Sequence, residues 1–241
     1  KGGLLIPVDR GQVLLLRNSS TAADLMKPFQ PPLEPGQRVN WHRPAVVANG
    51  EEFVIADDRK KLYRIGAEAA PQPHLKQLVS TQVDFEIVSP LAGLGDTVFA
   101  AVRVQGADSM VTFQAGDLSL GKEIALSGRV TWGPQRVGDG VLAASSGDGL
   151  LCFDAAGELV WKSPLAHGPL AGAPTPVGED YVMSSMSGVT WRVNGKNGMQ
   201  TDSFDVGEPL GAGPVLYRGS RLLLSGNDST LHVIPLLKGD S

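Results

Sequence analysis

The sequence contains few of the residues from which disulfide frameworks and zinc sites are built. It has a single cysteine, Cys152, which excludes an internal disulfide bond. Four histidines lie far apart, at positions 42, 74, 167 and 232, so no zinc-type ligand spacing is present and we predict no metal site. Cys152 lies in the apolar run 150–153, where a thiol behaves as a small hydrophobic group, and we expect it to be buried.

Long apolar runs and basic stripes are also missing. Apolar runs such as 13–16 and 222–224 have the length of strands, whereas a helix needs about 20 apolar residues to cross a bilayer. The formal net charge is −4 at pH 7, and the one dense group of basic residues, in 59–64, is typical of a solvated turn. The sequence therefore predicts no nucleic-acid partner and no membrane span.

What the sequence does contain is a repeat of about 40 residues, and periods of this size indicate solenoids, propellers or arrays. In each copy a proline is followed by a glycine turn, an apolar run, a second Gly/Asp turn and another apolar run. The marker prolines are Pro44, Pro90, Pro134, Pro174 and Pro214.

The copy around Pro134 is the clearest one. We predict strands at 130–135, 141–145, 150–154 and 159–161. The turns between them contain Gly138-Asp139-Gly140, Gly147-Asp148-Gly149 and Ala155-Ala156-Gly157. Asp-Gly pairs between apolar runs are a strong hairpin signal, so the copy reads as four antiparallel strands.

Four short strands within 40 residues favour an all-β fold, a β-propeller of four-stranded antiparallel blades, over a two-sheet sandwich. We predict one propeller domain, 1–241, with six blades and with seven as the alternative. The modules are approximately 1–40, 41–86, 87–128, 129–168, 169–209 and 210–241, and the first and last are incomplete. We interpret the proline-rich segment 19–38 as a surface excursion.

The ends of the chain add an expectation. The sequence begins at Lys1 and reaches a predicted strand within a few residues, so we expect a processed or partial product. Residues upstream of Lys1 would then supply a first strand to the first blade and a fourth strand to the last blade.

The segment 153–161 resembles the repeat of the PQQ-like (quinoprotein-type, WD40-like) β-propellers. Asp154, Ala155, Gly157 and Trp161 fall in register with that repeat. The next module keeps Asn197-Gly198 but has Asp202 at the tryptophan position, and the module after Pro90 keeps Gly121 but has Ala125.

The resemblance implies structural roles for three of these residues. Asp154 and Gly157 would form the turn. Trp161 would bury on the order of 200 Å² over the neighbouring blade, with its indole N–H on a backbone carbonyl.

The PQQ-like family contains PQQ-dependent alcohol and glucose dehydrogenases, and also non-enzymatic scaffolds such as the lipoprotein of the outer-membrane β-barrel assembly machinery. The enzymes resemble eight-bladed rings that hold calcium and the quinone, and many cap the cofactor with adjacent cysteines. This chain has one tryptophan pattern, one cysteine and no calcium-type oxygen cluster. It also lacks the Gly-x-Ser-x-Gly, Walker and His-Glu-x-x-His motifs.

We therefore favour a non-catalytic propeller that binds a protein or peptide, with a glycan as another possible ligand, and that needs no cofactor. The alternatives are a PQQ- and calcium-dependent dehydrogenase or other propeller enzyme, and a structural module of a larger multidomain protein. The resemblance implies a periplasmic or other extracytoplasmic location.

Propeller topology places the loops before the first strands and the turns between the second and third strands on one face. We predict a binding site there that contains Trp41, His42, Arg43, Arg59, Trp132, Asp148 and His167, and Asp9 lies in another of these turns. Trp41 and Trp132 are interpreted as equivalent positions. Aromatic side chains beside Arg and His are typical of interface hot spots. The alternative is that the two tryptophans plug the channel and that His42 is a hydrogen-bonded loop residue.

Overall fold

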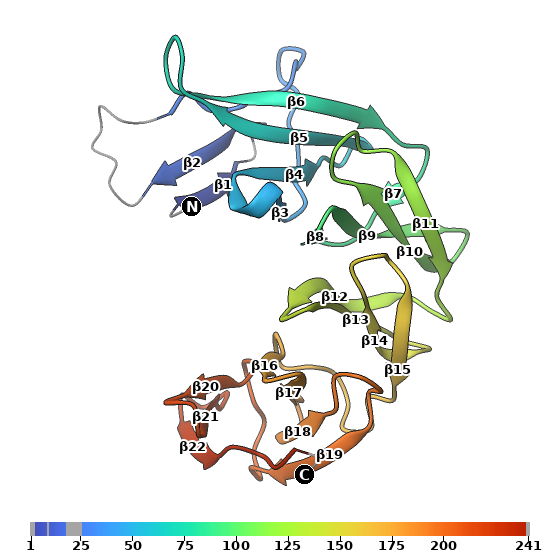
Figure 1. Ribbon diagram of the computed structural model, residues 1–241, viewed down its shortest axis with the longest axis vertical. Coiled ribbons are helices and arrows are strands. Elements are labelled where there is room, and N and C mark those ends of the chain that lie inside the picture. Colours follow the sequence, from blue (N-terminus) through green and yellow to red (C-terminus); the bar gives the residue numbers. More distant parts are fainter. Residues whose placement is uncertain (1–2, 9, 18–25, 240–241) are drawn as a thin grey trace. The chain divides into compact units, whose positions relative to one another are not determined.

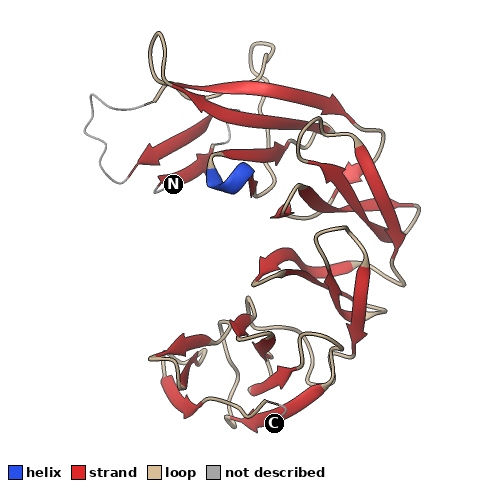
Figure 2. Cartoon of the chain, viewed as in Figure 1, coloured by secondary structure: helices blue, strands red, loops and turns tan. Residues whose placement is uncertain are grey.

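The computed structural model describes residues 3–8, 10–17 and 26–239, and the described chain is all-β apart from a single 3-10 turn, η2 (Ala48–Gly50) (Figures 1 and 2). Contacts divide the chain into two compact units, Lys1–Leu126 and Ser127–Ser241, and each is described by itself. The predicted turn residue Asp9 and residues 18–25 of the predicted excursion lie outside the described residues.

The first unit contains three sheets. The first sheet pairs β1 (Gly3–Pro7) with β2 (Val13–Arg17). The second runs in chain order through β3 (Ala45–Val47), β4 (Glu52–Ala56), β5 (Lys61–Glu68) and β6 (His74–Gln82). The third contains β7 (Glu86–Ile87), β8 (Ala92–Leu94), β9 (Thr97–Val104), β10 (Ala107–Gln114) and β11 (Leu120–Ala125), and both β7 and β8 pair with β9.

The second unit also contains three sheets, and all of them run in chain order. The first is β12 (Val130–Val137), β13 (Gly140–Ser145), β14 (Gly149–Phe153) and β15 (Leu159–Ser163). The second is β16 (Thr175–Val177), β17 (Asp180–Ser184), β18 (Val189–Val193) and β19 (Gln200–Asp205). The third has three strands, β20 (Val215–Tyr217), β21 (Arg221–Ser225) and β22 (Leu231–Pro235). The prediction of four-stranded antiparallel sheets is confirmed for β3–β6, β12–β15 and β16–β19.

Alternation along the strands of the first unit places apolar side chains on both faces of β3–β6. One face packs Val54 and Leu62 against Val98 and Val111 of the next sheet. The opposite face carries a second cluster, which consists of Val13, Met26, Phe29, Phe53, Ile55, Tyr63, Ile65 and Leu75. The sheet is therefore a middle layer, as its apolar strands require.

The described part of the proline-rich segment belongs to this second cluster. Met26 and Phe29 are buried, and the Val13 and Phe29 main chains exchange hydrogen bonds of 2.8 and 3.1 Å. The interpretation of segment 19–38 as a surface excursion was therefore wrong for Met26 and Phe29, whose side chains belong to the core, whereas most of residues 30–38 are exposed.

The sheets of the second unit pack on one another in the same way. Leu142 and Cys152 of β12–β15 meet Met183 and Trp191 of the next sheet. The reverse face of β16–β19 packs Val182 against the last sheet, through Leu222, Leu224 and Ile234. Cys152 is buried, as expected, and burial raises the pKa of its thiol to about 11.

A recurring irregularity marks the fourth strands. The pairing register shifts between Arg64 and Ile65, between Cys152 and Phe153, and between Arg192 and Val193. Each shift is a β-bulge at the same place in its sheet, so the repeat is visible in register as well as in sequence.

Candidate functional site

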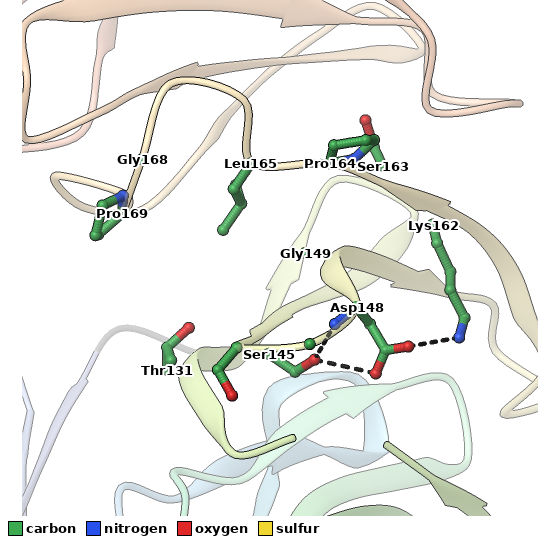
Figure 3. Close-up of a pocket in the computed structure, with 12 residues that line it drawn as sticks. Thr131, Ser145, Asp148, Gly149, Lys162, Ser163, Pro164, Leu165, Gly168 and Pro169 are labelled. Carbon is green, nitrogen blue, oxygen red and sulfur yellow. Dashed lines mark hydrogen bonds and ion pairs between the residues drawn. The ribbon is translucent and has the colours of Figure 1, made fainter. Parts of the chain in front are cut away.

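An open groove of about 670 Å³ lies in the second unit, beside the sheet β12–β15 (Figure 3). One wall is the turn between β13 and β14, and the other is the segment that leaves β15. The lining residues are Thr131, Ser145, Ser146, Gly147, Asp148, Gly149, Lys162, Ser163, Pro164, Leu165, Gly168 and Pro169. The predicted site residue Asp148 is thus part of a concave surface.

Asp148 organises the β13–β14 turn, and its side chain is only 4% exposed. Its carboxylate accepts hydrogen bonds from the Ser127 N–H at 2.7 Å and Oγ at 2.9 Å, from Ser145 Oγ at 3.0 Å and from Lys162 Nζ at 2.7 Å. The Asp148 N–H in turn donates to Ser145 Oγ at 2.9 Å.

These donors decide the ionisation of Asp148. Burial by itself raises the pKa of a carboxyl group, but the hydrogen bonds from Lys162, Ser127 and Ser145 outweigh it and lower the pKa of Asp148 to about 2. A carboxylate that is ionised and surrounded by donors is a fixed anion. It holds the turn and the Lys162 side chain in place, and it is poorly suited to take up a proton in a reaction.

The opposite wall of the groove is apolar. Leu165 points into the groove between Pro164 and Pro169 in Figure 3. The Met186 N–H donates to the Pro169 carbonyl at 2.9 Å, and the Met186 side chain is 55% exposed beside this wall. The groove thus combines an apolar wall with a polar turn, as ligand-binding clefts commonly do.

The other predicted residues of this unit lie outside the groove lining. Trp132 is half-buried and, like Leu165, packs against the core cluster of this unit. Its neighbour Thr131 lines the groove. His167 stands over the Trp191 ring at 5.1 Å, and its Nε2 is 3.0 Å from Gln200 Oε1. Sequence reasoning found Asp148 here but missed the apolar wall, for which the proline pair Pro164 and Pro169 was the available signal.

The predicted residues of the first unit form a separate group, around Asp57. Trp41 packs its ring on Phe29 and Tyr63, at centroid distances of 6.4 and 5.7 Å. Its Nε1 is buried without a hydrogen-bond partner among the described residues. The geometry favours a packing role for the Trp41 ring.

Trp41 and Trp132 do not occupy equivalent positions. Trp41 forms a bridge with Asp57, and the residue that pairs with the matching position, Ser145, is Val130. The register then shifts before Trp132 pairs with Ala144. The two register shifts in β12 separate the positions of the two tryptophans, and the sequence gives no sign of them.

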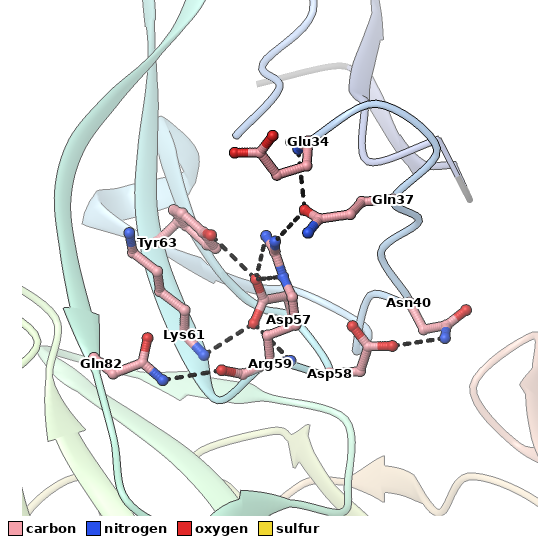
Figure 4. Close-up of polar contacts among 9 residues, drawn as sticks. All are labelled: Glu34, Gln37, Asn40, Asp57, Asp58, Arg59, Lys61, Tyr63 and Gln82. Carbon is pink, nitrogen blue, oxygen red and sulfur yellow. Dashed lines mark hydrogen bonds and ion pairs between the residues drawn. The ribbon is translucent and has the colours of Figure 1, made fainter. Parts of the chain in front are cut away.

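The turn between β4 and β5 is built around the buried carboxylate of Asp57 (Figure 4). Asp57 accepts hydrogen bonds from the Arg59 N–H at 3.0 Å, from the Lys61 N–H at 2.9 Å and from Tyr63 Oη at 3.1 Å. Arg59 also folds its guanidinium back on this carboxylate, at 3.2 Å. Burial, reinforced by Asp57, raises the pKa of Tyr63 to about 12. Arg59 therefore contributes to the turn, with part of its side chain still exposed.

His42 is half-buried and Arg43 is exposed in the same loop. Burial lowers the pKa of His42 below its ordinary value, against the opposing effects of Asp58, a hydrogen bond to the Ser89 main chain, Asp57 and Glu86. Neutral His42 is thus the form that this environment favours.

The second unit contains the three residues to which the PQQ-like resemblance assigns structural roles, Asp154, Gly157 and Trp161. Asp154 Oδ1 accepts the N–H groups of Ala156 and Glu158, each at 2.9 Å, and Gly157 adopts φ +77°. Trp161 donates its indole N–H to the Gly195 carbonyl of the next sheet at 2.8 Å.

The corresponding turn between β10 and β11 corrects the sequence alignment. Leu118, and not Gly121, takes the left-handed position there, with φ +60°, and its side chain is 1% exposed in the core. Gly121 lies within β11, where a Cβ would come within 2.6 Å of Thr112 Oγ1. The motif was misplaced because a buried leucine occupies the position where glycine is usual.

One histidine, one carboxylate and one hydroxyl meet at the edge of the last sheet. His232 contacts Glu208 and Thr230, but both contacts involve the same ring nitrogen, Nε2. A catalytic relay uses the two ring nitrogens for different partners, so this arrangement is not a triad. Among the described residues, no three His, Cys, Asp or Glu side chains are placed to hold a metal ion.

No protein-family model matches the sequence, and no curated protein sequence matches it. Solved structures do match its fold. BamB from Moraxella catarrhalis has a TM-score of 0.61 and 14% identity, over 98% of this chain and 70% of that chain. The computationally designed Ika8 protein has a TM-score of 0.66 and 10% identity, over 98% and 69% of the two chains.

BBS1N in its complex with ARL6DN has a TM-score of 0.64 and 15% identity, over 99% of this chain and 75% of that chain. At these identities the likeness shows the fold alone. BamB and BBS1N are β-propellers, so this chain has sheets of the propeller type. No described helix is long and apolar enough to cross a membrane.

Proposed function

We propose that this chain is a non-catalytic scaffold of the PQQ-like propeller type that binds an extended segment of a partner protein in the groove beside β12–β15. The observation that carries the proposal is the groove itself, in which an apolar wall at Leu165 faces a turn whose carboxylate is already engaged. Such a cleft can recognise a side chain, but it presents no poised acid, base or nucleophile.

The polar atoms of the groove support binding over chemistry. Ser145 Oγ is shared with Asp148, Ser146 Oγ accepts the Arg129 N–H at 3.0 Å, and Thr131 Oγ1 donates to the Ala144 carbonyl at 3.3 Å. Burial of an apolar side chain against Leu165 would therefore supply most of the affinity. The neighbour BBS1N, which was solved in complex with ARL6DN, is a precedent for a protein ligand on this fold.

The enzyme alternative requires residues that hold calcium against a quinone. The described residues contain no group of three ligating side chains, so they do not fit that pair. We keep six blades in one domain, with seven as the alternative, as part of the proposal. An extracytoplasmic location is also proposed, on the resemblance of 153–161, and fractionation of cells that make the protein tests it.

A displayed peptide library selected on the immobilised 241-residue protein tests the groove. The best peptide is then titrated by fluorescence anisotropy against the wild type, Leu165→Asp and Ser146→Tyr. We expect both variants to weaken binding by at least about tenfold. Leu165→Asp removes the apolar contact and Ser146→Tyr fills the space that the peptide side chain would occupy, and either loss should cost more than about 1.4 kcal/mol.

The matched control is Val160→Asp, because Val160 is 47% exposed on β15 and does not line the groove. Ser146→Tyr removes one exposed hydrogen bond, from the Arg129 N–H, so it should lower the melting temperature less than Leu165→Asp, which places a carboxylate against the core cluster. Equal binding by all variants would reject the groove, and selection of no peptide together with binding on a glycan array would reject a protein partner.

A further inference from the structure

The turns between the second and third strands of the second unit lie at one end of its three sheets. These turns are 145–149, 185–189 and 226–230, and each closes with a main-chain contact between its first and last residues. The sheets pack on one another in chain order. The three turns therefore follow one another along this end of the unit, about 10 Å apart, which is the spacing of packed sheets.

The positively charged side chains at this end belong to the first of the three sheets. Arg129 lies beside the turn 145–149, because its N–H donates to Ser146 Oγ at 3.0 Å and its carbonyl accepts the Ser146 N–H at 2.9 Å. Lys162 lies beside the same turn and donates to Asp148 at 2.7 Å (Figure 3). Asp148 balances the charge of Lys162, so the exposed Arg129 leaves this part of the surface positive. The other described basic residues of the unit lie toward the opposite end of the sheets, namely Arg136, Arg192, Lys196, Arg218, Arg221 and Lys238.

Carboxylates gather at the other two turns. Asp205 ends β19 beside the turn 185–189, since it pairs with the first residue of β18, and it is exposed. Glu208 is held against the same turn, where a Cβ on Gly188 would collide with the Glu208 carbonyl. Asp228 lies in the last turn. The acidic groups thus follow the basic ones in the order in which the sheets pack.

The last turn holds two of these carboxylates by hydrogen bonds. Thr230 Oγ1 is 2.6 Å from a carboxylate oxygen of Glu208 and of Asp228, and the Thr230 N–H donates to Asp228 at 3.0 Å. These bonds lower the pKa of Asp228, so this carboxyl group is ionised at neutral pH. His232 contacts Glu208, and even a protonated His232 would leave Asp205 and Asp228 to make this part of the surface negative.

An apolar zone separates the two charged parts. The wall of the groove at Leu165 and Pro169 reaches the turn 185–189, where the Met186 N–H donates to the Pro169 carbonyl at 2.9 Å. The Met186 side chain is 55% exposed, and no charged residue lies in this turn. This end of the unit therefore runs from a positive turn, through an apolar groove, to a negative turn.

We propose that the partner segment in the groove is divided in charge, with acidic side chains toward Arg129, basic side chains toward Glu208 and Asp228, and an apolar residue between them. This inference rests on the proposed function and names the chemistry of its partner. An extended chain advances about 3.3 Å per residue, so one sheet spacing corresponds to roughly three residues. The acidic residues should lie within about three residues of the apolar one, and the basic residues about three to six residues from it on the other side. Complementary charges at both ends would fix the orientation of the segment.

The probe is a displayed library of thirteen-residue peptides with leucine at the centre and Asp, Lys or Ser at every other position. After selection on the immobilised 241-residue protein, we expect enriched peptides to carry Asp on one side of the leucine and Lys on the other, in either chain direction. In fluorescence anisotropy, replacement of the Asp residues or of the Lys residues by Ser should each weaken binding about threefold, as for exposed ion pairs. High salt should remove this difference in the wild type, which requires no variant to fold.

Two variants assign the preferences to the two ends of the surface. Arg129→Glu should remove the selection for Asp. Asp228→Asn, which keeps an acceptor for the Thr230 N–H, should reduce the selection for Lys. The matched controls are Arg136→Glu and Asp139→Asn, because both residues are exposed at the opposite end of the first sheet, and both controls should select like the wild type.

The possible outcomes separate this inference from the groove itself. Enrichment that depends on Leu165 but shows no charge preference, or a charge preference that Arg129→Glu leaves intact, would overturn the divided charge and leave the groove standing. Charge-divided peptides that bind Leu165→Asp as tightly as the wild type would reject the groove as the apolar contact and support the assignment of the charges. Enrichment of no peptide would overturn both.

Discussion

At the scale of the residue, single side chains join neighbouring sheets of the second unit. Trp161 of β15 lies over the turn 194–199 of the next sheet, where a Cβ on Gly198 would come within 2.5 Å of its ring. Gly198 is constrained twice, since its φ of +71° already favours glycine. A tryptophan on one strand thus selects a glycine almost forty residues later.

Gly198→Ala tests this double constraint against Gly207→Ala. Gly207 also has a positive φ, +82°, but a Cβ there meets nothing within 4 Å. We expect Gly207→Ala to lower the free energy of unfolding by about 1 kcal/mol, from backbone strain alone. Gly198→Ala should lower it by a further 1 to 3 kcal/mol, roughly the cost of overpacking, as measured by urea denaturation. If the two variants lose the same unfolding free energy, the Trp161 ring moves aside for the added methyl group at no energetic cost.

His42 gives stability a pH dependence whose sign follows from burial. The folded state lowers the pKa of His42 below its unfolded value of about 6.5, so the unfolded chain takes up the proton more readily. The contribution of neutral His42 is therefore complete above that value and is lost as pH falls below it.

Urea denaturation of the wild type and His42→Asn between pH 8 and pH 5 measures this contribution. As the solution is acidified, we expect the wild type to lose unfolding free energy relative to His42→Asn, because Asn does not titrate. Parallel curves would mean that Asp58, Asp57 and Glu86 compensate fully for the burial.

At the scale of the element, hairpins were predictable and bulges were not. The turns Gly138-Asp139-Gly140 and Gly147-Asp148-Gly149 connect the strands that the sequence predicts, because Asp and Gly adopt turn conformations for local reasons. The bulges in the fourth strands depend on pairing with a neighbour and leave no local signal. Register shifts of the same kind in the first strand β12, on both sides of Trp132, are the reason that Trp41 and Trp132 were misaligned.

The same distinction separates the parts of the candidate site. Asp148 was found because it lies in a repeated turn. The apolar wall was missed because Leu165 acquires its role only when the chain leaves β15 beside that turn. The turn at Leu118 was missed for the same reason. The residue at its left-handed position is a leucine, and burial of that side chain offsets the cost of the backbone conformation.

At the scale of the whole molecule, the repeat predicted the class of fold. Its period and its turns indicated antiparallel sheets of the propeller type, and the described sheets and the solved neighbours bear out that coarser statement. The ligand was not predictable in the same way, because a repeat specifies packing and a site depends on the loops that differ between copies.

Cofactor binding is a property of the whole protein, and the sequence predicts none. After addition of PQQ and calcium to the purified protein, we expect desalting to remove all quinone absorbance, because the described residues offer no ligand cluster for the metal. A lysozyme sample treated identically corrects for nonspecific retention. Quinone absorbance retained in a one-to-one ratio would favour the dehydrogenase alternative.

The contact between Trp161 and the following turn has a counterpart one sheet later. Asp202 stands at the position of Trp161 in β19, and its carboxylate accepts the Lys238 N–H at 2.8 Å, just after β22. Each of these two sheets is thus hydrogen-bonded through its fourth strand to the next sheet along the chain, a contact that we call the clasp. The stability of this unit should therefore depend on coupling between neighbouring sheets. Such a chain can lose or duplicate one repeat and still offer the same clasp to its successor, which gives evolution a simple way to change the length of the array.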